Sequence, residues 1–365
     1  MTETLLQRFG QFTETVTYAT LPAAVIQSLK ERALDTIGLC LAATPLDTSR
    51  MMVEMVSHWG GHAEATAIGT SQSLPAPSAA LINGTLAHSL DYDDTHLPSV
   101  LHPSASLIPG VFAAAEAIRA DSKDVLAALA VGYEMCVRSG MAGYDRALGN
   151  SVFFERGWHA TSICGTLGVA AAVAKLYRLG AAGVMHAVGI AASMGSGIIE
   201  GNRAGGSVKR MHCGWAAHAG LVAAQMARAG FTGPPSALEG RFGFYQAFCS
   251  GQFDEGEFVN GLGETWCVPE IFYKPYPANH FTHAGIDAAL KLAARIDNLD
   301  DIVDIELGVP SPVLRTIAQP PEQQARPQSG YHAQFSGPFT IAIALMTKVT
   351  GGGGLGLWLD DFIDV

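Results

Sequence analysis

Three basic side chains stand where helices are expected to begin, and that position gives them a specific chemistry. His102, His159 and Lys209 each lie at the start of an apolar run rich in small residues. Unpaired N–H groups and the positive end of the helix dipole favour anions there. The same field lowers the pKa of a histidine, which then remains a neutral base near pH 7. The pattern predicts a pocket for an anionic substrate, and the alternative is three unrelated helix caps.

An acidic segment, HSLDYDDTH at residues 88–96, lies shortly before His102. Its three aspartates in four positions could ligate a hard cation, but the glycine and distal glutamate of a calcium loop are absent. Asp91 and Asp94 could instead cap backbone amides or orient a nearby histidine. For Asp93 and Asp94, capping and loop hydrogen bonds are the competing interpretation.

A fourth polar segment, YKPYPANHFTH, runs from Tyr273 to His283. Its prolines fix the backbone around Lys274, which favours a positioned cation over a mobile surface lysine. The segment lies at the expected boundary between two domains, where ligand sites are common. His280 and His283 are three residues apart, as two zinc ligands could be, but no HExxH motif or third ligand accompanies them. We therefore predict no metal.

The chain as a whole is apolar and acidic, which excludes several classes of protein. Of its 365 residues, 48% are hydrophobic and 15% charged, and the formal net charge is −11. Intrinsic disorder needs the opposite composition, and nucleic-acid binding needs a basic surface. Because no uninterrupted apolar stretch of about 20 residues is present, no membrane span is expected. The absence of a signal peptide and six dispersed cysteines without a CxxC pair predict reduced thiols and a cytoplasmic location.

Helical periodicity dominates the first two thirds of the chain. Pro22 would lie in the first turn of an early helix, where its missing N–H does no harm, and apolar residues then recur at helical spacing. Further helices are expected at about 76–89, 104–119, 123–143, 160–177, 181–194, 213–229 and 234–247. The small residues in most of these helices allow their axes to approach closely.

The pattern changes after residue 268. Residues 274–296 predict a loop and a helix, and DIVDIELGVP at 301–310 alternates like a strand. A polar loop at 321–334 and an apolar helix at 335–348 follow. We expect a mainly α fold, with a large helical domain at 1–268 and a smaller α+β lid domain at 269–365. Because a lone strand cannot satisfy its backbone groups, the lid is expected to be truncated at the C-terminus.

Together, the polar segments resemble the MmgE/PrpD family, which contains 2-methylcitrate dehydratases, cis-aconitate decarboxylases and iminodisuccinate epimerases. The stretches that carry the resemblance are HSLDYDDTH with HPSAS, GWHATSICGTLGVAAAVAKL, KRMHCGWAAHAGL and KPYPANHFTHAGIDA. It covers nearly the whole chain. The resemblance implies a helical domain with an α+β lid, a homodimer, a small di- or tricarboxylate substrate, and no metal or organic cofactor.

The resemblance also implies active-site residues by matching position. These are Asp91, Thr95, His102, His159, Lys209 and Lys274. Removing a proton next to a carboxylate builds negative charge there, so Lys209 and Lys274 would hold substrate carboxylates. His102 and His159 would be general acid and base, in an order left open, and Asp91 would orient one imidazole.

Besides Lys274, four side chains are expected to contact the substrate rather than move protons. They are Thr95, through its hydroxyl, and Asn279, His280 and His212. Asn279 stands where the resemblance implies a histidine in the decarboxylase branch. The stretch from Thr95 to His102 is one residue longer than that branch implies.

These differences rank dehydration first among the expected activities. The sequence therefore predicts a cofactor-free lyase of the 2-methylcitrate dehydratase type, with a decarboxylase or epimerase of the same family as the alternative. A third hypothesis is a non-catalytic helical binding protein or a truncated family member. An iron–sulfur dehydratase would need clustered cysteines, and the six here are dispersed.

Overall fold

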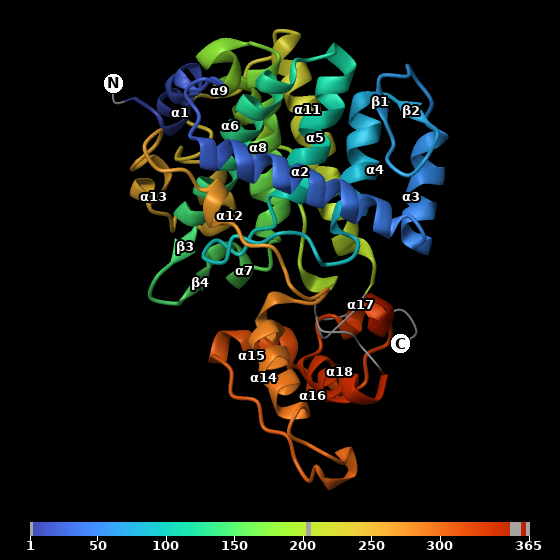
Figure 1. The fold of residues 1–365 in the computed structure, drawn as a ribbon. Helices are drawn as coiled ribbons and strands as arrows, with labels where there is room; N and C mark the ends of the chain where they lie inside the picture. The colour runs from blue at the N-terminus through green and yellow to red at the C-terminus, as the bar shows by residue number, and fades with distance from the viewer. Residues whose placement is uncertain (1–2, 202–205, 351–358, 363–365) are drawn as a thin grey trace. The chain divides into compact units, whose positions relative to one another are not determined.

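The computed structural model describes residues 3–201, 206–350 and 359–362, and the chain forms two compact units (Figure 1). The first unit contains residues 3–89, 93–199 and 207–272. The second contains Leu90–Tyr92, the described residues of 200–206, and the described chain from Tyr273 onward. The acidic segment is therefore divided, since Leu90–Tyr92 belong to the second unit and the rest of the segment to the first.

The first unit is built of helices with two small hairpins (Figure 1). Its helices are α1 (Leu5–Thr15), α2 (Ala23–Ala43), α3 (Asp47–Ser57), α4 (Ala76–His88), α5 (Ser104–Ile118), α6 (Ser122–Ala142), α7 (Val152–Glu155), α8 (Ala160–Leu176), α9 (Gly180–Ala191), α11 (Val208–Arg228), α12 (Phe244–Cys249), α13 (Glu255–Val259) and the 3₁₀ helix η1 (Val268–Glu270). The antiparallel hairpins pair β1 (Ala65–Thr66) with β2 (Ser73–Leu74), and β3 (Tyr144–Asp145) with β4 (Asn150–Ser151).

The helices begin where the local sequence favours a start. Pro22 and Pro75 immediately precede α2 and α4, and the Asp121 carboxylate caps α6 by accepting the backbone N–H of Lys123 at 2.8 Å. His159 is the residue before α8, and Lys209 is the second residue of α11. The prediction that these two basic side chains lie at helix starts is confirmed, and His102 lies two residues before α5.

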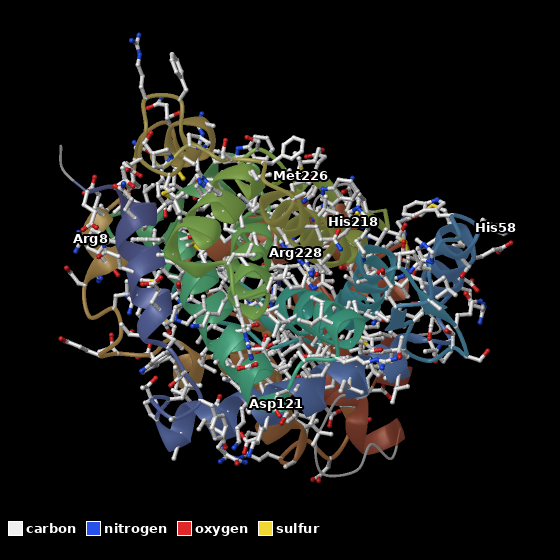
Figure 2. The ribbon with its side chains drawn as sticks, turned by 90° about the horizontal axis from the view of Figure 1, so that it is seen from above. Arg8, His58, Asp121, His218, Met226 and Arg228 are labelled. Atoms are coloured by element: carbon white, nitrogen blue, oxygen red, sulfur yellow. The ribbon has the colours of Figure 1, made fainter. Side chains whose placement is uncertain are left out.

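Helix α8 is the centre of the first unit. It packs against α5, α6, α9 and α11, and all its residues except Lys175 are buried. Figure 2 shows side chains filling the spaces between the helices, with His218, Met226 and Arg228 marking the course of α11. In the described part of the chain, α6 alone is long and apolar enough to cross a membrane by length and composition, and most of it is buried among its neighbours.

Glycines allow α4 and α11 to approach closely. A Cβ atom on Gly214 would lie 2.2 Å from the carbonyl oxygen of Leu81 and 2.3 Å from the Thr85 hydroxyl. A Cβ atom on Gly84 would lie 2.7 Å from the Cα of Gly214. Only glycine therefore fits at positions 84 and 214.

The second unit is smaller and consists of short helices. They are η2 (His280–Thr282), α14 (His283–Ala293), η3 (Leu299–Asp301), α15 (Ser311–Ile317), α16 (Pro321–Ala325), α17 (Gly330–Ala333), α18 (Gly337–Thr350) and η4 (Leu359–Phe362). Its core lies between α14 and α18 and includes Tyr276, Ile286, Ile341, Leu345 and Phe362.

The mainly α fold with a smaller C-terminal part is confirmed, and four expected helices match almost to the residue. These four are the helices at about 76–89, 104–119, 123–143 and 160–177. The helix expected at 181–194 ends at Ala191, and the one expected at 213–229 begins earlier, at Val208.

Three local predictions are wrong. The helix expected at 234–247 is a series of turns up to Gly243, because Pro234, Pro235, Gly240 and Gly243 interrupt it, and only Phe244–Cys249 is helical. The strand expected at 301–310 is absent: its residues have no ladder partner among the described ranges, and Val303 is fully exposed. The polar loop at 321–334 contains α16 and α17. Residues 351–358 and 363–365 of the expected lid, and residues 202–205 before the helix that carries Lys209, lie outside the described residues.

Candidate active site

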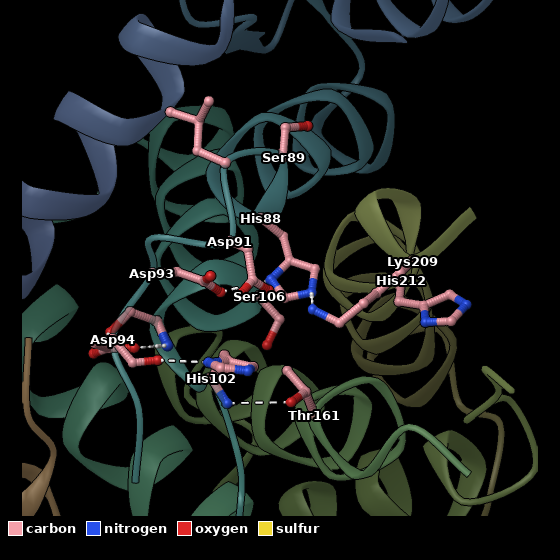
Figure 3. Close-up of polar contacts among 12 residues, drawn as sticks. His88, Ser89, Asp91, Asp93, Asp94, His102, Ser106, Thr161, Lys209 and His212 are labelled. Carbon is pink, nitrogen blue, oxygen red and sulfur yellow. Dashed lines mark hydrogen bonds and ion pairs between the residues drawn. The ribbon is translucent and has the colours of Figure 1, made fainter. Parts of the chain in front are cut away.

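His88, the last residue of α4, connects a carboxylate to a lysine inside the first unit. Its Nδ1 lies 2.7 Å from Oδ2 of Asp93, and its Nε2 lies 3.0 Å from Nζ of Lys209 (Figure 3). A carboxylate accepts, so the proton of a neutral His88 sits on Nδ1 and its Nε2 accepts from the lysine. All three side chains are buried. The imidazole of His88 therefore links the carboxylate of Asp93 to the ammonium of Lys209.

His102 lies beside this chain of contacts, with its ring centroid 5.4 Å from that of His88. Its Nδ1 is 3.0 Å from the backbone oxygen of Asp94 and 3.0 Å from Oγ1 of Thr95. Since a carbonyl oxygen only accepts, this contact places the proton on Nδ1 and a lone pair on Nε2. The backbone N–H of His102 donates to the Thr161 hydroxyl at 3.2 Å, which ties the loop to α8 (Figure 3). The loop therefore fixes the tautomer of a neutral His102.

His159 and His212 extend the cluster to four imidazoles. The His159 ring stacks on His88 with 5.5 Å between centroids, and its centroid lies 5.0 Å from that of His212. Their Nδ1 atoms are 2.9 Å apart. His159 comes from the start of α8 and His212 from the first turns of α11, so the two central helices position the pair.

Burial keeps His159 and His212 neutral. Desolvation, followed by the cationic forms of His212, Lys209, His88 and His102, lowers the pKa of His159 well below its usual value. Desolvation, His88 and Lys209 lower the pKa of His212 to about 4. Near pH 7 both rings are therefore neutral and able to exchange protons.

Asp94 anchors the loop that carries Thr95 and His102. Its Oδ2 lies 2.6 Å from a guanidinium nitrogen of Arg32, and its Oδ1 accepts the backbone N–H of Ser104 at 3.2 Å. Arg32, on α2, also donates to the backbone oxygen of Ile271. Capping by Asp94 was one of the open interpretations of the acidic segment, and the contact with Ser104 at the start of α5 confirms it.

The second unit holds the other predicted cation. Nζ of Lys274 lies 3.0 Å from Oδ2 of Asp91 and 2.6 Å from its backbone oxygen, and both side chains are buried. Asp91 adopts a φ of 48°, in the left-handed region that aspartate tolerates. The amide of Gln334 donates to the backbone oxygens of Leu90 and Pro277, which fixes the two segments of this unit together.

Asn279 and His280 also lie in the second unit, and both contact the neighbouring Phe281. The amide oxygen of Asn279 accepts the backbone N–H of Phe281 at 3.1 Å and so caps η2. His280 packs on Phe281 with 4.2 Å between ring centroids. Nε2 of His283 lies 3.0 Å from the backbone oxygen of Ala278. This contact occupies one ring nitrogen of His283, which with His280 has the spacing of two zinc ligands.

One group of side chains in the described ranges has atoms close enough to share a metal ion. Ligand atoms of His88, Asp93 and Cys213 lie within 4.8 Å of one another. Both ring nitrogens of His88 already contact Asp93 and Lys209, so a metal there would have to displace one of those contacts. The donor set fits proton chemistry better than metal binding.

The first unit brings together most of the residues predicted from sequence, together with two that sequence reasoning did not select. Thr95, His102, His159, Lys209 and His212 lie in the buried cluster, whereas Asp91, Lys274, Asn279 and His280 belong to the second unit. The missed residues are His88 and Asp93. The carboxylate that the structure places on an imidazole is Asp93, whereas Asp91 pairs with Lys274.

Both units match a known protein family. The MmgE/PrpD N-terminal domain matches residues 7–256 and the MmgE/PrpD C-terminal domain matches residues 276–352. The chain belongs to the MmgE/PrpD family, as the resemblance of its polar segments predicts.

Curated relatives from fungi and mammals carry the name of one activity in this family. The cis-aconitate decarboxylase-like protein oryM of Aspergillus oryzae is 29% identical over 345 residues, which cover 89% of this chain and 70% of that protein. A cis-aconitate decarboxylase of Aspergillus terreus is 28% identical over 345 residues, covering 90% of this chain and 69% of that protein. The human cis-aconitate decarboxylase is 29% identical over 272 residues, covering 73% of this chain and 54% of that protein.

Proposed function

We propose that this protein is a lyase that acts on a small di- or tricarboxylate by general acid/base chemistry, and that its leading reaction is decarboxylation of a cis-aconitate-like substrate. The observation that carries the proposal is the buried cluster of four imidazoles with Lys209. The names of its relatives support decarboxylation over the dehydration ranked first from sequence.

The chemistry of a decarboxylation matches these groups. The bond between carbon and the departing carboxylate breaks, its electron pair stays on the carbon, and a proton replaces the CO₂ that leaves. A lysine ammonium next to a remaining carboxylate stabilises the developing charge. An imidazole that carries a proton on the nitrogen facing the substrate then delivers it. Lys209 and His159 have these roles in the proposal.

Dehydration is the second candidate. This reaction needs a base, and Nε2 of His102 can provide one. In that reaction the Nε2 lone pair of His102 would remove a proton next to a carboxylate, while an imidazole N–H protonates the departing hydroxyl. Asn279 also stands where the resemblance implies a histidine in decarboxylases. A binding protein without turnover is the third hypothesis.

The three hypotheses are separated by one set of assays on the purified protein. It is incubated with cis-aconitate or 2-methylcitrate, and CO₂ release and formation of an unsaturated acid are measured separately. We expect CO₂ and a five-carbon unsaturated dicarboxylate from cis-aconitate. Alkene formation from 2-methylcitrate without CO₂ would establish the dehydratase instead. Ligand-induced thermal stabilisation without turnover would establish a binding protein.

The role of His102 as the base of a dehydration is tested with His102→Asn, assayed on 2-methylcitrate. Asparagine can donate to Asp94 from a position close to Nδ1 but has no group at Nε2. We expect kcat to fall by about 10²-fold or more, because general acid/base catalysis contributes about 10²–10⁴-fold. The matched control is His62→Asn, the same replacement at an exposed position. Equal activity of the two variants would remove His102 from the mechanism.

A further inference from the structure

We propose that His212 is the proton-relay partner of His159: when both rings are neutral, they share one proton between their Nδ1 atoms and therefore present one bare Nε2 and one Nε2–H. The proposal deepens the proposed function, and its relay step rests on that function. It assigns His212 a positioning and proton-transfer role in place of the substrate contact expected from sequence.

The contact between the two rings is held from both backbones. Their Nδ1 atoms are 2.9 Å apart with 43° between the ring planes. The backbone N–H of His159 donates to the oxygen of Gly197 at 3.0 Å, and the Ser162 hydroxyl donates to the backbone oxygen of His212 at 3.0 Å. A Cβ atom on Gly197 would lie 3.4 Å from Nδ1 of His212, so this side of the pair is closely packed.

Tautomer chemistry follows from that contact. A neutral imidazole has one N–H and one lone pair. A hydrogen bond between two Nδ1 atoms needs the N–H of one ring and the lone pair of the other. The donor ring then has a bare Nε2, which is a base, and the acceptor ring has its proton on Nε2, which is an acid. The two neutral tautomers are thus complementary.

The same contact allows a proton to pass through the pair. When the donor ring takes up a proton at its bare Nε2, it becomes an imidazolium with two N–H groups. Its Nδ1 proton moves to Nδ1 of the partner, and the partner releases its Nε2 proton. One proton enters, one leaves, and each ring has changed tautomer. In the decarboxylation proposed above, this transfer supplies the proton that replaces CO₂.

The groups around the pair destabilise the imidazolium form of either ring. The titratable groups that act on the pair are His88 from α4, Lys209 from α11 and His102 from the loop before α5. All of these groups are cationic when protonated. Together with burial they lower the pKa of both rings, so an imidazolium is a transient species near pH 7.

The tautomers can be measured without any substrate. Ring ¹⁵N shifts of the ¹⁵N-histidine-labelled protein at pH 7 are assigned with His159→Gln and His212→Asn. We expect one ring of the pair to carry its proton on Nδ1, the other on Nε2, and a coupling between the two Nδ1 nitrogens. Two rings with the same tautomer, or one ring that is an imidazolium at pH 7, would overturn the proposal.

The relay itself is tested by kinetics of two variants at position 212. His212→Asn keeps an amide close to the Nδ1 position, so it can still hold His159, but it cannot pass a proton onward. His212→Phe removes both capacities. We expect both variants to lower kcat by about 10²-fold, with a smaller change in KM. A purely structural role predicts rescue by asparagine, and that rescue would contradict the relay.

His218→Asn is the control on the same helix, where Nδ1 of His218 contacts the backbone oxygen of Pro77 at 2.9 Å, and we expect unchanged kcat. The two proposals fail separately. Absence of turnover with any carboxylate would end the proposed function, and the ¹⁵N tautomers would still decide the pairing of the rings. Turnover together with identical tautomers would end the relay alone.

Discussion

At the scale of single residues, the defining feature is an imidazole with both nitrogens engaged. His88 accepts from Lys209 at Nε2 and donates to Asp93 at Nδ1. A buried ammonium needs acceptors, because transfer of an unpaired charge from water is costly. Asp93 therefore acts on Lys209 at a distance, through the tautomer of the ring between them.

This predicts a large effect from a change of one atom. In Asp93→Asn the side chain can donate as well as accept, so the proton of His88 is no longer confined to Nδ1. If it moves to Nε2, it faces the ammonium of Lys209. We expect kcat to fall by about 10²-fold while the fold is retained, measured by steady-state kinetics and circular dichroism.

The control makes the same replacement at Asp121→Asn. Asp121 caps α6 at an exposed position, and asparagine caps helices equally well, so activity and stability should be unchanged. Equal turnover of the Asp93→Asn protein and the wild type would show that the aspartate does not act through His88.

Sequence reasoning selected most of this cluster but not the residue at its centre. His102, His159 and Lys209 stand out because each lies near a helix start. His88 ends a helix, and its partners lie five and 121 residues away in the chain. No spacing rule predicts the second separation. The first, a histidine at a helix end followed five residues later by aspartate, was a usable signal.

At the scale of elements, the site depends on how closely α4 and α11 cross. These helices carry His88 and Lys209, whose nitrogens are 3.0 Å apart, and Gly84 meets Gly214 at the crossing. A displacement of one helix by about an ångström would break that contact, since hydrogen bonds weaken steeply beyond their normal range.

We expect Gly214→Ala to lower stability and activity together. The new methyl group would lie 2.2 Å from a backbone oxygen, which cannot rotate away, so the helices must separate. Overpacking of this kind costs about 1–3 kcal/mol. Urea unfolding measures the loss of stability, and steady-state kinetics measure the loss of kcat.

Gly38→Ala is the matched control in α2. A Cβ atom at this position has open space around it, and alanine favours a helix over glycine by about 1 kcal/mol. We expect a neutral or more stable protein with wild-type turnover. A Gly214→Ala protein that behaves like the Gly38→Ala control would show that the crossing tolerates a methyl group.

The sequence predicted helices better than it predicted other elements, for a physical reason. Helices such as α6 and α8 are long and built of good helix formers, so the local pattern decides them. The stretch at 301–310 has the alternation of a strand, but a strand also needs a partner, and partners are set by long-range packing. Local pattern carries no information about that partner.

At the scale of the whole molecule, buried histidines in both units contribute to the pH dependence of stability. Burial is the first cause that lowers the pKa of His96, His212 and His283 to about 4. Between pH 6.5 and 4 the unfolded chain therefore binds protons that the native chain does not. The contribution of these three histidines to the free energy of unfolding therefore falls as the pH is lowered through this window. Asp35, whose pKa burial raises to about 7, acts in the opposite direction.

His283→Gln isolates one of these contributions in the second unit. Lys274, Asp91 and Asp287 also act on this ring, and its Nε2 contacts the backbone oxygen of Ala278. The glutamine amide can keep that contact and does not titrate. Between pH 6.5 and 5 we expect the wild type to lose roughly 2 kcal/mol relative to the variant.

Urea unfolding of both proteins at the two pH values measures this change. A difference between wild type and variant that is the same at pH 6.5 and pH 5 would show that His283 titrates alike in the native and unfolded chains.

The divided acidic segment constrains how this protein can be recombined with its relatives. Asp91 precedes Lys274 by 183 residues in the chain, yet the two side chains form an ion pair. A hybrid that joins the front of one relative to the back of another inherits these two residues from different parents. It retains the buried pair only if both parents supply it, and a mismatch would leave one charge buried without its counterion.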